Sequence, residues 1–169
     1  MILEIVKYPD NRLKHKSTEI ENFDDELHSF LDDMRETMIA RNGIGLAGVQ
    51  VGILKRVFII NIPNEENEYS DENLLEVINP KIVEKYGNTS YEEGCLSIPE
   101  YFETVQRAEK IDVSFFDRHG NEQRKRLSGL HAIAFQHEFD HLNGRVFVER
   151  ISYMKKRKFE KEWKKRIRE

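Results

Sequence analysis

The sequence predicts one domain in which α-helices are combined with short β-strands. Apolar residues recur at helical spacing in residues 24–42 and 128–143, whereas β-branched and aromatic residues dominate segments such as Arg56–Pro63. The 169 residues are enough to bury a substantial core, and no internal repeat, linker or low-complexity run divides them. We therefore expect residues 1–169 to form a single domain.

Composition narrows the class of protein. Hydrophobic residues make up 38% of the chain and charged residues 34%, which is typical of a globular protein with a heavily charged surface. No apolar run approaches the ~20 residues that span a bilayer, and Met1–Val6 lacks the features of a secretory signal. Cys95 is the only cysteine, which excludes an intrachain disulfide and indicates a reducing compartment. These features predict a cytoplasmic protein with no membrane association.

The individual elements follow from local sequence patterns. Residues 1–22 have the character of an extended arm, and Asp24 is a suitable N-cap for a helix that Asn42-Gly43 would end. Ser128 would begin the second helix, and Ser152 a basic C-terminal helix. The expected strands are Arg56–Pro63, Leu74–Ile78, Lys81–Tyr86, Lys110–Phe116, Gln123–Leu127 and Val146–Val148.

A glycine-rich segment follows the first helix. Residues 43–52 contain four glycines, which permit unusual backbone angles or the close approach of another group. The segment lacks the G-K-[ST] of a phosphate-binding loop, and its spacing is not G-x-G-x-x-G. It fits better as a loop against which a peptide lies.

The second helix carries the pattern H-E-x-x-H, formed by His137, Glu138 and His141. The four-residue spacing places both imidazoles on one helix face, one turn apart, where they can share a metal ion. Glu138 lies about 100° around the helix, so it can reach a water molecule on that metal without binding the metal itself. The flanking residues are so apolar that the helix should be buried, and buried His and Glu need partners such as a metal ion.

A metal centre of this kind needs a third protein ligand, for which the sequence offers two kinds of candidate. Glu160 and Glu162 follow His141 at the distance used by H-E-x-x-H proteases, but they stand among lysines, where i,i+4 pairing on a solvated helix explains them better. Cys95 follows Gly94 in a bend and is the stronger ligand when it is a thiolate. The alternative for Cys95 is an ordinary buried cysteine.

Three motifs resemble those of the peptide deformylases and occur in the same order along the chain. They are GIGLAGVQ at residues 43–50, EGCLS at residues 93–97 and QHEFDH at residues 136–141. Tyr8-Pro9-Asp10 and Arg107-Ala108 also match, so the resemblance covers nearly the whole chain. It implies an α+β fold in which antiparallel β-strands wrap around a central H-E-x-x-H helix, with an N-terminal helix and a basic C-terminal helix.

The resemblance also implies an activity and a metal. Peptide deformylases are metallohydrolases that remove the N-formyl group from the formylmethionine of newly synthesised polypeptides and release formate. Their metal would be one Fe(2+) per chain, replaceable by nickel, cobalt or zinc, whereas one Cys and two His by themselves would favour zinc. The implied metal ligands are Cys95, His137 and His141.

Further roles can be assigned to residues around the metal. Glu138 would be the general base, and the side-chain amide of Gln50 and the backbone N–H of Leu96 would stabilise the oxyanion. Small and apolar residues would form the methionine pocket, and backbone groups would hold the peptide as an added strand. The residues expected to contact the substrate are Ile44, Gly45, Gly94, Arg107, Ile133 and Ala134. Plain helix packing explains Ile133 and Ala134 equally well. The resemblance places Arg107 at the edge of the pocket, but this residue is equally compatible with a solvated charge before a strand.

The net charge of −4 is unevenly distributed, because residues 155–169 carry +6 and the rest of the chain carries −10. Such a tail would be attracted to ribosomal RNA, although a plain solvated helix is an equally good interpretation of the charge. Phe159, Trp163 and Ile167 recur every four residues, so an apolar stripe can dock on the rest of the chain or on a ribosomal protein.

Two other functions remain open from the sequence. An endopeptidase would use the same helix with Glu160 or Glu162 as the third ligand. A non-enzymatic protein would use the metal for structure and the basic tail as an RNA-binding arm.

Overall fold

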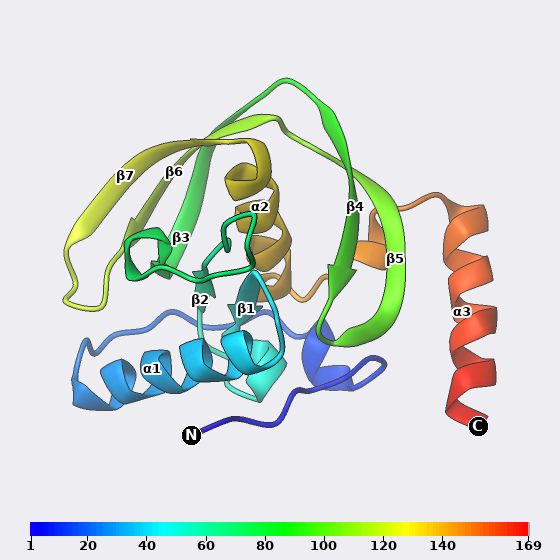
Figure 1. Ribbon diagram of the computed structural model, residues 1–169, viewed down its shortest axis with the longest axis horizontal. Helices are drawn as coiled ribbons and strands as arrows, with labels where there is room; N and C mark the ends of the chain where they lie inside the picture. Colours follow the sequence, from blue (N-terminus) through cyan, green and yellow to red (C-terminus); the bar gives the residue numbers. More distant parts are fainter. Residues whose placement is uncertain (169) are drawn as a thin grey trace.

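The structure is a computed structural model that describes residues 1–168 (Figure 1). These residues form three α-helices and two antiparallel sheets, which confirms the expected α+β fold. The helices are α1 (Asp25–Ala40), α2 (Gly129–Leu142) and α3 (Tyr153–Arg168). The larger sheet, in the order β1-β2-β3-β6-β7, comprises β1 (Gly45–Ala47), β2 (Val57–Ile60), β3 (Leu75–Tyr86), β6 (Lys110–Phe116) and β7 (Glu122–Ser128). The smaller sheet is the hairpin of β4 (Thr89–Cys95) and β5 (Ile98–Arg107).

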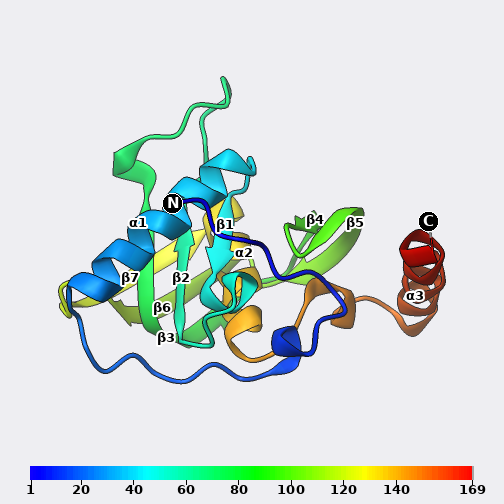
Figure 2. The same ribbon diagram turned by 90° about the horizontal axis from the view of Figure 1, so that it is seen from below.

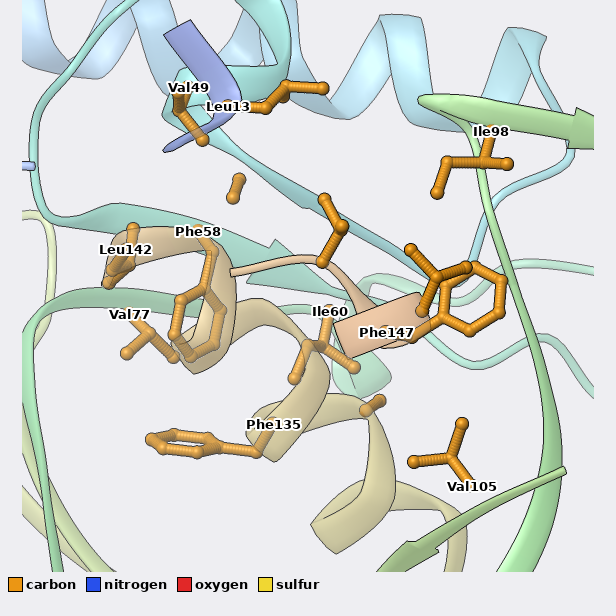
Figure 3. Packing of buried hydrophobic residues seen from close by; sticks show 14 of the residues in the cluster. Leu13, Val49, Phe58, Ile60, Val77, Ile98, Val105, Phe135, Leu142 and Phe147 are labelled. Carbon is orange, nitrogen blue, oxygen red and sulfur yellow. The ribbon is translucent and has the colours of Figure 1, made fainter. Parts of the chain in front are cut away.

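The H-E-x-x-H helix, α2, lies between the larger sheet and the β4–β5 hairpin (Figure 1). Its sequence is apolar on nearly all sides, and Phe135 is fully buried against Phe58 of β2, with ring centroids 4.9 Å apart (Figure 3). Burying a side chain of this size contributes roughly 1.5–3 kcal/mol. Packing of this kind fixes α2 against the sheet, and with it the polar residues that the helix carries.

β2 is buried on both faces, which explains why its sequence is apolar without alternation. Phe58 and Ile60 pack in the cluster around α2, whereas Val57 and Ile59 pack in a second cluster with α1. The predicted apolar stripe of α1 lies in that second cluster, and the carboxylate of Asp24 caps the helix as expected. The sheet therefore has a helix on each face.

One predicted break in the sheet does not occur. β3 runs without interruption through Asn79-Pro80, where two short strands were expected. The pairing register shifts between Ile78 and Lys81, and Asn79 adopts a positive φ of 51°. The Asn79 side chain supports this bulge by hydrogen bonding to both the N–H and the C=O of Ile20.

Two further segments differ from the prediction. Val146–Val148 is not a strand, because Phe147–Glu149 form a 3₁₀ turn that buries Phe147 in the core. The β4–β5 hairpin was not predicted, since its outer strand positions are polar and its turn at residues 96–97 contains no glycine or proline.

α3 lies at the edge of the molecule, beside β5 (Figure 2). Phe159 is fully buried between Tyr8 and Tyr101, and Trp163 donates a hydrogen bond from Nε1 to the carbonyl of Tyr8 at 3.2 Å. Ile167 stays 62% exposed. The apolar stripe of the tail thus docks on the rest of the chain through its first two members.

Within residues 1–168, no helix is both long enough and apolar enough to cross a membrane.

Candidate metal centre

Three potential metal ligands converge at one point between α2 and the β4–β5 hairpin. His137 and His141 stand one helical turn apart, with 3.2 Å between their Nε2 atoms. Cys95 ends β4, and its Sγ lies 3.4 Å from Nε2 of His141. The three donor atoms all lie within 4.8 Å of one another. Glu160 and Glu162, the alternative third ligands, are exposed on α3.

These donors fit a metal ion. With bond lengths of ~2.0–2.3 Å, as for zinc, a tetrahedral ion separates its ligand atoms by about 3.3–3.6 Å, close to the separations observed. One thiolate and two imidazoles suit zinc, iron and nickel, so the donor set does not select among them. An endopeptidase with a downstream glutamate as ligand is not supported, because Cys95, and neither Glu160 nor Glu162, lies with the two histidines.

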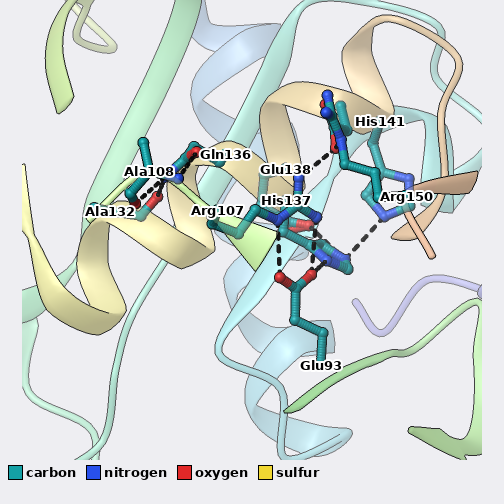
Figure 4. Close-up of polar contacts among 10 residues, drawn as sticks. Glu93, Arg107, Ala108, Ala132, Gln136, His137, Glu138, His141 and Arg150 are labelled. Carbon is teal, nitrogen blue, oxygen red and sulfur yellow. Dashed lines mark hydrogen bonds and ion pairs between the residues drawn. The ribbon is translucent and has the colours of Figure 1, made fainter. Parts of the chain in front are cut away.

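His137 is oriented by Glu93, the first residue of the EGCLS motif, for which the sequence predicted no role. Nδ1 of His137 lies 2.8 Å from a carboxylate oxygen of Glu93 (Figure 4). A proton on Nδ1 would be donated to this carboxylate, which leaves the lone pair of Nε2 directed at the metal position. Glu93 thus contacts the site only through His137, whose ring it orients.

Glu93 belongs to a buried ionic chain. Arg107 donates to Glu93 from Nε and Nη2 at 2.8 and 2.9 Å, and to Asp140 from Nη1 at 2.6 Å. Asp140 also accepts two hydrogen bonds of 2.7 Å from Arg150. Burial alone would raise the pKa of Glu93, but the bonds from Arg107 and His137 lower that pKa to about 2.

Arg107 therefore lies elsewhere than the sequence indicated. It was expected at the edge of the substrate pocket, yet its side chain is only 3% exposed and its guanidinium donates to both Glu93 and Asp140. Asp140 and Arg150 were not predicted as site residues. The available signal was Asp140 itself, a carboxylate within a helix predicted to be buried, which required a cationic partner.

Glu138 is buried beside the metal ligands. Its Oε1 is 4.0 Å from Nε2 of His137 and has no hydrogen-bond partner among residues 1–168. Burial raises the pKa of Glu138 to about 7, and the charge of His137 opposes this only in part. A β-carbon on Gly45 would lie 2.8 Å from Oε2, so glycine is needed there for the carboxylate to reach its position. Glu138 is thus placed as a proton acceptor near neutral pH.

Gln50 directs its amide toward the same centre. Its Oε1 accepts a hydrogen bond of 2.9 Å from the N–H of Ala47, which fixes the orientation of the amide. Nε2 then lies 3.3 Å from Sγ of Cys95 and 3.1 Å from Oγ of Ser97. Ser97, in the turn of the β4–β5 hairpin, was not predicted as part of the site.

A cavity of about 570 Å³ opens next to these groups. It is lined by every residue expected to contact the substrate except Arg107, namely Ile44, Gly45, Gly94, Ile133 and Ala134, and also by Leu96. β1 forms one wall and is an edge strand of the larger sheet. Because the carbonyl of Ile44 pairs with Asn61, the alternation of an antiparallel ladder turns the backbone groups of Gly45 away from β2.

Fold and site together define a class: a metal-dependent hydrolase with an H-E-x-x-H helix, a cysteine beside its two histidines and a cavity beside a free strand edge. The sequence model of the polypeptide deformylases matches residues 2–157. A peptide deformylase of Nautilia profundicola is 49% identical over 168 residues, which cover 99% of this chain and 97% of the relative. The chain belongs to the peptide deformylase family.

Solved structures agree with this assignment. The peptide deformylase of Ehrlichia chaffeensis in complex with actinonin is 42% identical, with a TM-score of 0.89 over 99% of each chain. That of Plasmodium falciparum is 38% identical, with a TM-score of 0.91 over 98% of this chain and 95% of the other.

Proposed function

We propose that Cys95, His137 and His141 hold the metal ion with which this enzyme performs its reaction. The enzyme removes the N-formyl group from the formylmethionine of newly synthesised polypeptides and releases formate. The observation that carries the assignment of ligands is the convergence of Cys95 with the two histidines. We further propose that residues 1–169 act as one catalytic domain in the cytoplasm.

The bound metal would supply a Lewis acid that polarises the formyl group and lowers the pKa of a water molecule. Glu138 accepts the proton of the attacking water and passes it to the leaving amine. Its carboxylate suits this role because it is buried, its Oε1 has no hydrogen-bond partner within residues 1–168, and its pKa is about 7. Gln50 donates from Nε2, and Leu96 from its backbone N–H, to the oxyanion that develops on the formyl oxygen. Each such donor contributes about 10²–10³ in rate in other enzymes.

The peptide would bind as an added strand along β1. The outward backbone groups of Gly45, with Gly94 on the facing hairpin, are placed to pair with the chain that follows the formylmethionine. Ile44, Ile133 and Ala134 line the cavity and would form the methionine pocket. Arg107 would act at a distance, by holding the Glu93 carboxylate that orients His137.

The native metal is proposed to be Fe(2+), with nickel, cobalt or zinc as substitutes, and this rests on the family resemblance. The ribosome is proposed as a partner of α3, whose exposed face is rich in lysine and arginine. Nascent formylmethionyl chains are the substrate, and they emerge from the ribosome. An enzyme bound to the ribosome would therefore be close to its substrate.

Formate release tests the proposal most simply. The metal-loaded enzyme should release formate from a formyl-Met dipeptide. In a parallel assay, it should not cleave the internal bonds of an unformylated peptide. Cys95→Ser should bind metal more weakly and lose most formate release. Cleavage of internal bonds, or full activity of Cys95→Ser, would contradict the assignment.

A further inference from the structure

A second cavity, of about 700 Å³, lies against a different face of α2 from the metal centre. Gln136, Phe139 and Asn143 of α2 line it, whereas Ile133 and Ala134 line the substrate cavity. We call it the rear cavity. The reaction proposed above makes no use of it.

The rear cavity carries an excess of positive charge. Its charged lining residues are Lys16, Lys85, Arg107, Arg145, Arg150 and Asp140. Asp140 is fully engaged by Arg107 and Arg150, and Arg107 also neutralises Glu93. Lys16, Lys85 and Arg145 are exposed residues of this lining, and none of them has an ion-pair partner within residues 1–168. Three cations thus share one hollow without a paired carboxylate.

This concentration of charge runs against the rest of the chain. Residues 1–154 carry a net charge of −10, so cations gathered in one cavity are not a consequence of general composition. Like charges held together raise the free energy of the folded state, and a bound anion would remove that cost. An adjoining hollow shares Arg145 and Arg150 and adds one cation, Lys156, and one anion, Glu149.

The remaining lining residues indicate what kind of anion. Phe139 and Ile82 are half-buried and present apolar surface beside the cations. Gln106 and Asn143 add amide groups, and Oδ1 of Asn143 already accepts a hydrogen bond from Arg56, which leaves its amide N–H groups as donors. Cations, amides and an aromatic ring together suit a phosphate joined to a flat heterocycle.

We propose that the rear cavity binds the phosphate of a nucleotide, either free or within single-stranded RNA. Lys16, Lys85 and Arg145 hold the phosphate oxygens, and the base lies against Phe139. The cavity shares Arg107 and Asp140 with the ionic chain behind His137, but the three residues proposed to hold the phosphate take no part in deformylation. The proposal therefore stands or falls independently of the reaction proposed above.

The test is a calorimetric titration of the metal-loaded enzyme with inorganic phosphate, a mononucleotide and a short single-stranded RNA, each in a separate experiment. The mononucleotide should bind more tightly than inorganic phosphate, because it adds the contact with Phe139. The double variant Lys85→Gln, Arg145→Gln should weaken mononucleotide binding by about tenfold or more. Its turnover of a formyl dipeptide should stay unchanged, which shows that the variant is folded.

The matched control is Lys125→Gln, Lys164→Gln, which removes two exposed lysines outside the cavity. It should leave mononucleotide binding unchanged. Equal loss of binding in both double variants would overturn the proposal, and so would the absence of binding by phosphate and mononucleotide at millimolar concentration. RNA binding without mononucleotide binding would also overturn it, since general surface charge would then explain the result.

Discussion

At the scale of single residues, the site depends on Glu138, whose carboxylate is buried without a hydrogen-bond partner at Oε1 within residues 1–168. Burial is the main cause that raises its pKa to about 7, and the negative charges of Glu93 and Asp140 act in the same direction. Gly45 makes this position of the carboxylate possible, because any larger residue would displace Oε2. Gly45 also lies in β1, the edge strand, and its backbone groups point away from β2.

Replacement of Glu138 by Gln should separate catalysis from metal binding. The amide keeps the size of the side chain but cannot take a proton, so formate release should fall by about 10²–10⁴. Metal content should stay at one ion per chain, because Glu138 is not among the converging ligands. Near-normal turnover in this variant would remove Glu138 from the mechanism.

The thiolate of Cys95 should make the iron enzyme sensitive to oxygen. Ferrous iron and a bound thiolate both react with oxygen, whereas nickel(II) resists oxidation. We expect nickel-loaded enzyme to keep its formate release in air for much longer than iron-loaded enzyme. Equal rates of inactivation would show that oxidation of the metal is not the cause.

At the scale of elements, α2 and the β4–β5 hairpin are joined by the ionic chain from His137 through Glu93 and Arg107 to Asp140. Arg107→Met would leave two buried carboxylates, Glu93 held only by His137 and Asp140 held only by Arg150, which should lower the free energy of unfolding by about 3–5 kcal/mol. Loss of the Glu93 orientation should also weaken metal binding by about 10–100-fold. Chemical denaturation and metal titration measure the two effects.

Arg126→Met is the matched control for that variant. Arg126 pairs with Asp112 at 2.7 Å across β6 and β7, but its side chain is 63% exposed. Stability and metal affinity should therefore be nearly unchanged. If the two variants behaved alike, the buried chain would have no special part in holding the site.

Some helices and strands could be predicted from the sequence, and others could not. The α1 stripe and strand β6 follow from periodicity, because each buries one regular face. The H-E-x-x-H helix is buried on nearly all sides and follows from its apolar composition. The β4–β5 hairpin follows from neither, since its strands are stabilised by contacts with distant residues such as Tyr8 and Phe159 rather than by a local pattern. For the same reason the partners of Arg107, which come from β4 and α2, were not predictable.

At the scale of the whole molecule, α3 combines a docked apolar side with a basic exposed side. Deleting residues 155–169 would remove Phe159 from the core as well as the charge, so it would not isolate the electrostatic effect. Replacing Lys161, Lys164 and Lys165 by Gln keeps both aromatic contacts. This triple variant should co-sediment with ribosomes much less at low salt and turn over a formyl dipeptide normally. Binding that is indifferent to salt or to the substitutions would leave α3 as a surface helix.

In the proposed metal centre, one sulfur and two imidazole nitrogens from this chain hold the metal. X-ray absorption at the metal edge of the loaded enzyme measures this directly, because sulfur and nitrogen neighbours scatter differently and bind at ~2.3 and ~2.0–2.1 Å. The expected spectrum contains one sulfur neighbour in the wild type, which is lost in Cys95→Ser. A spectrum without sulfur in the active wild-type enzyme would contradict the account.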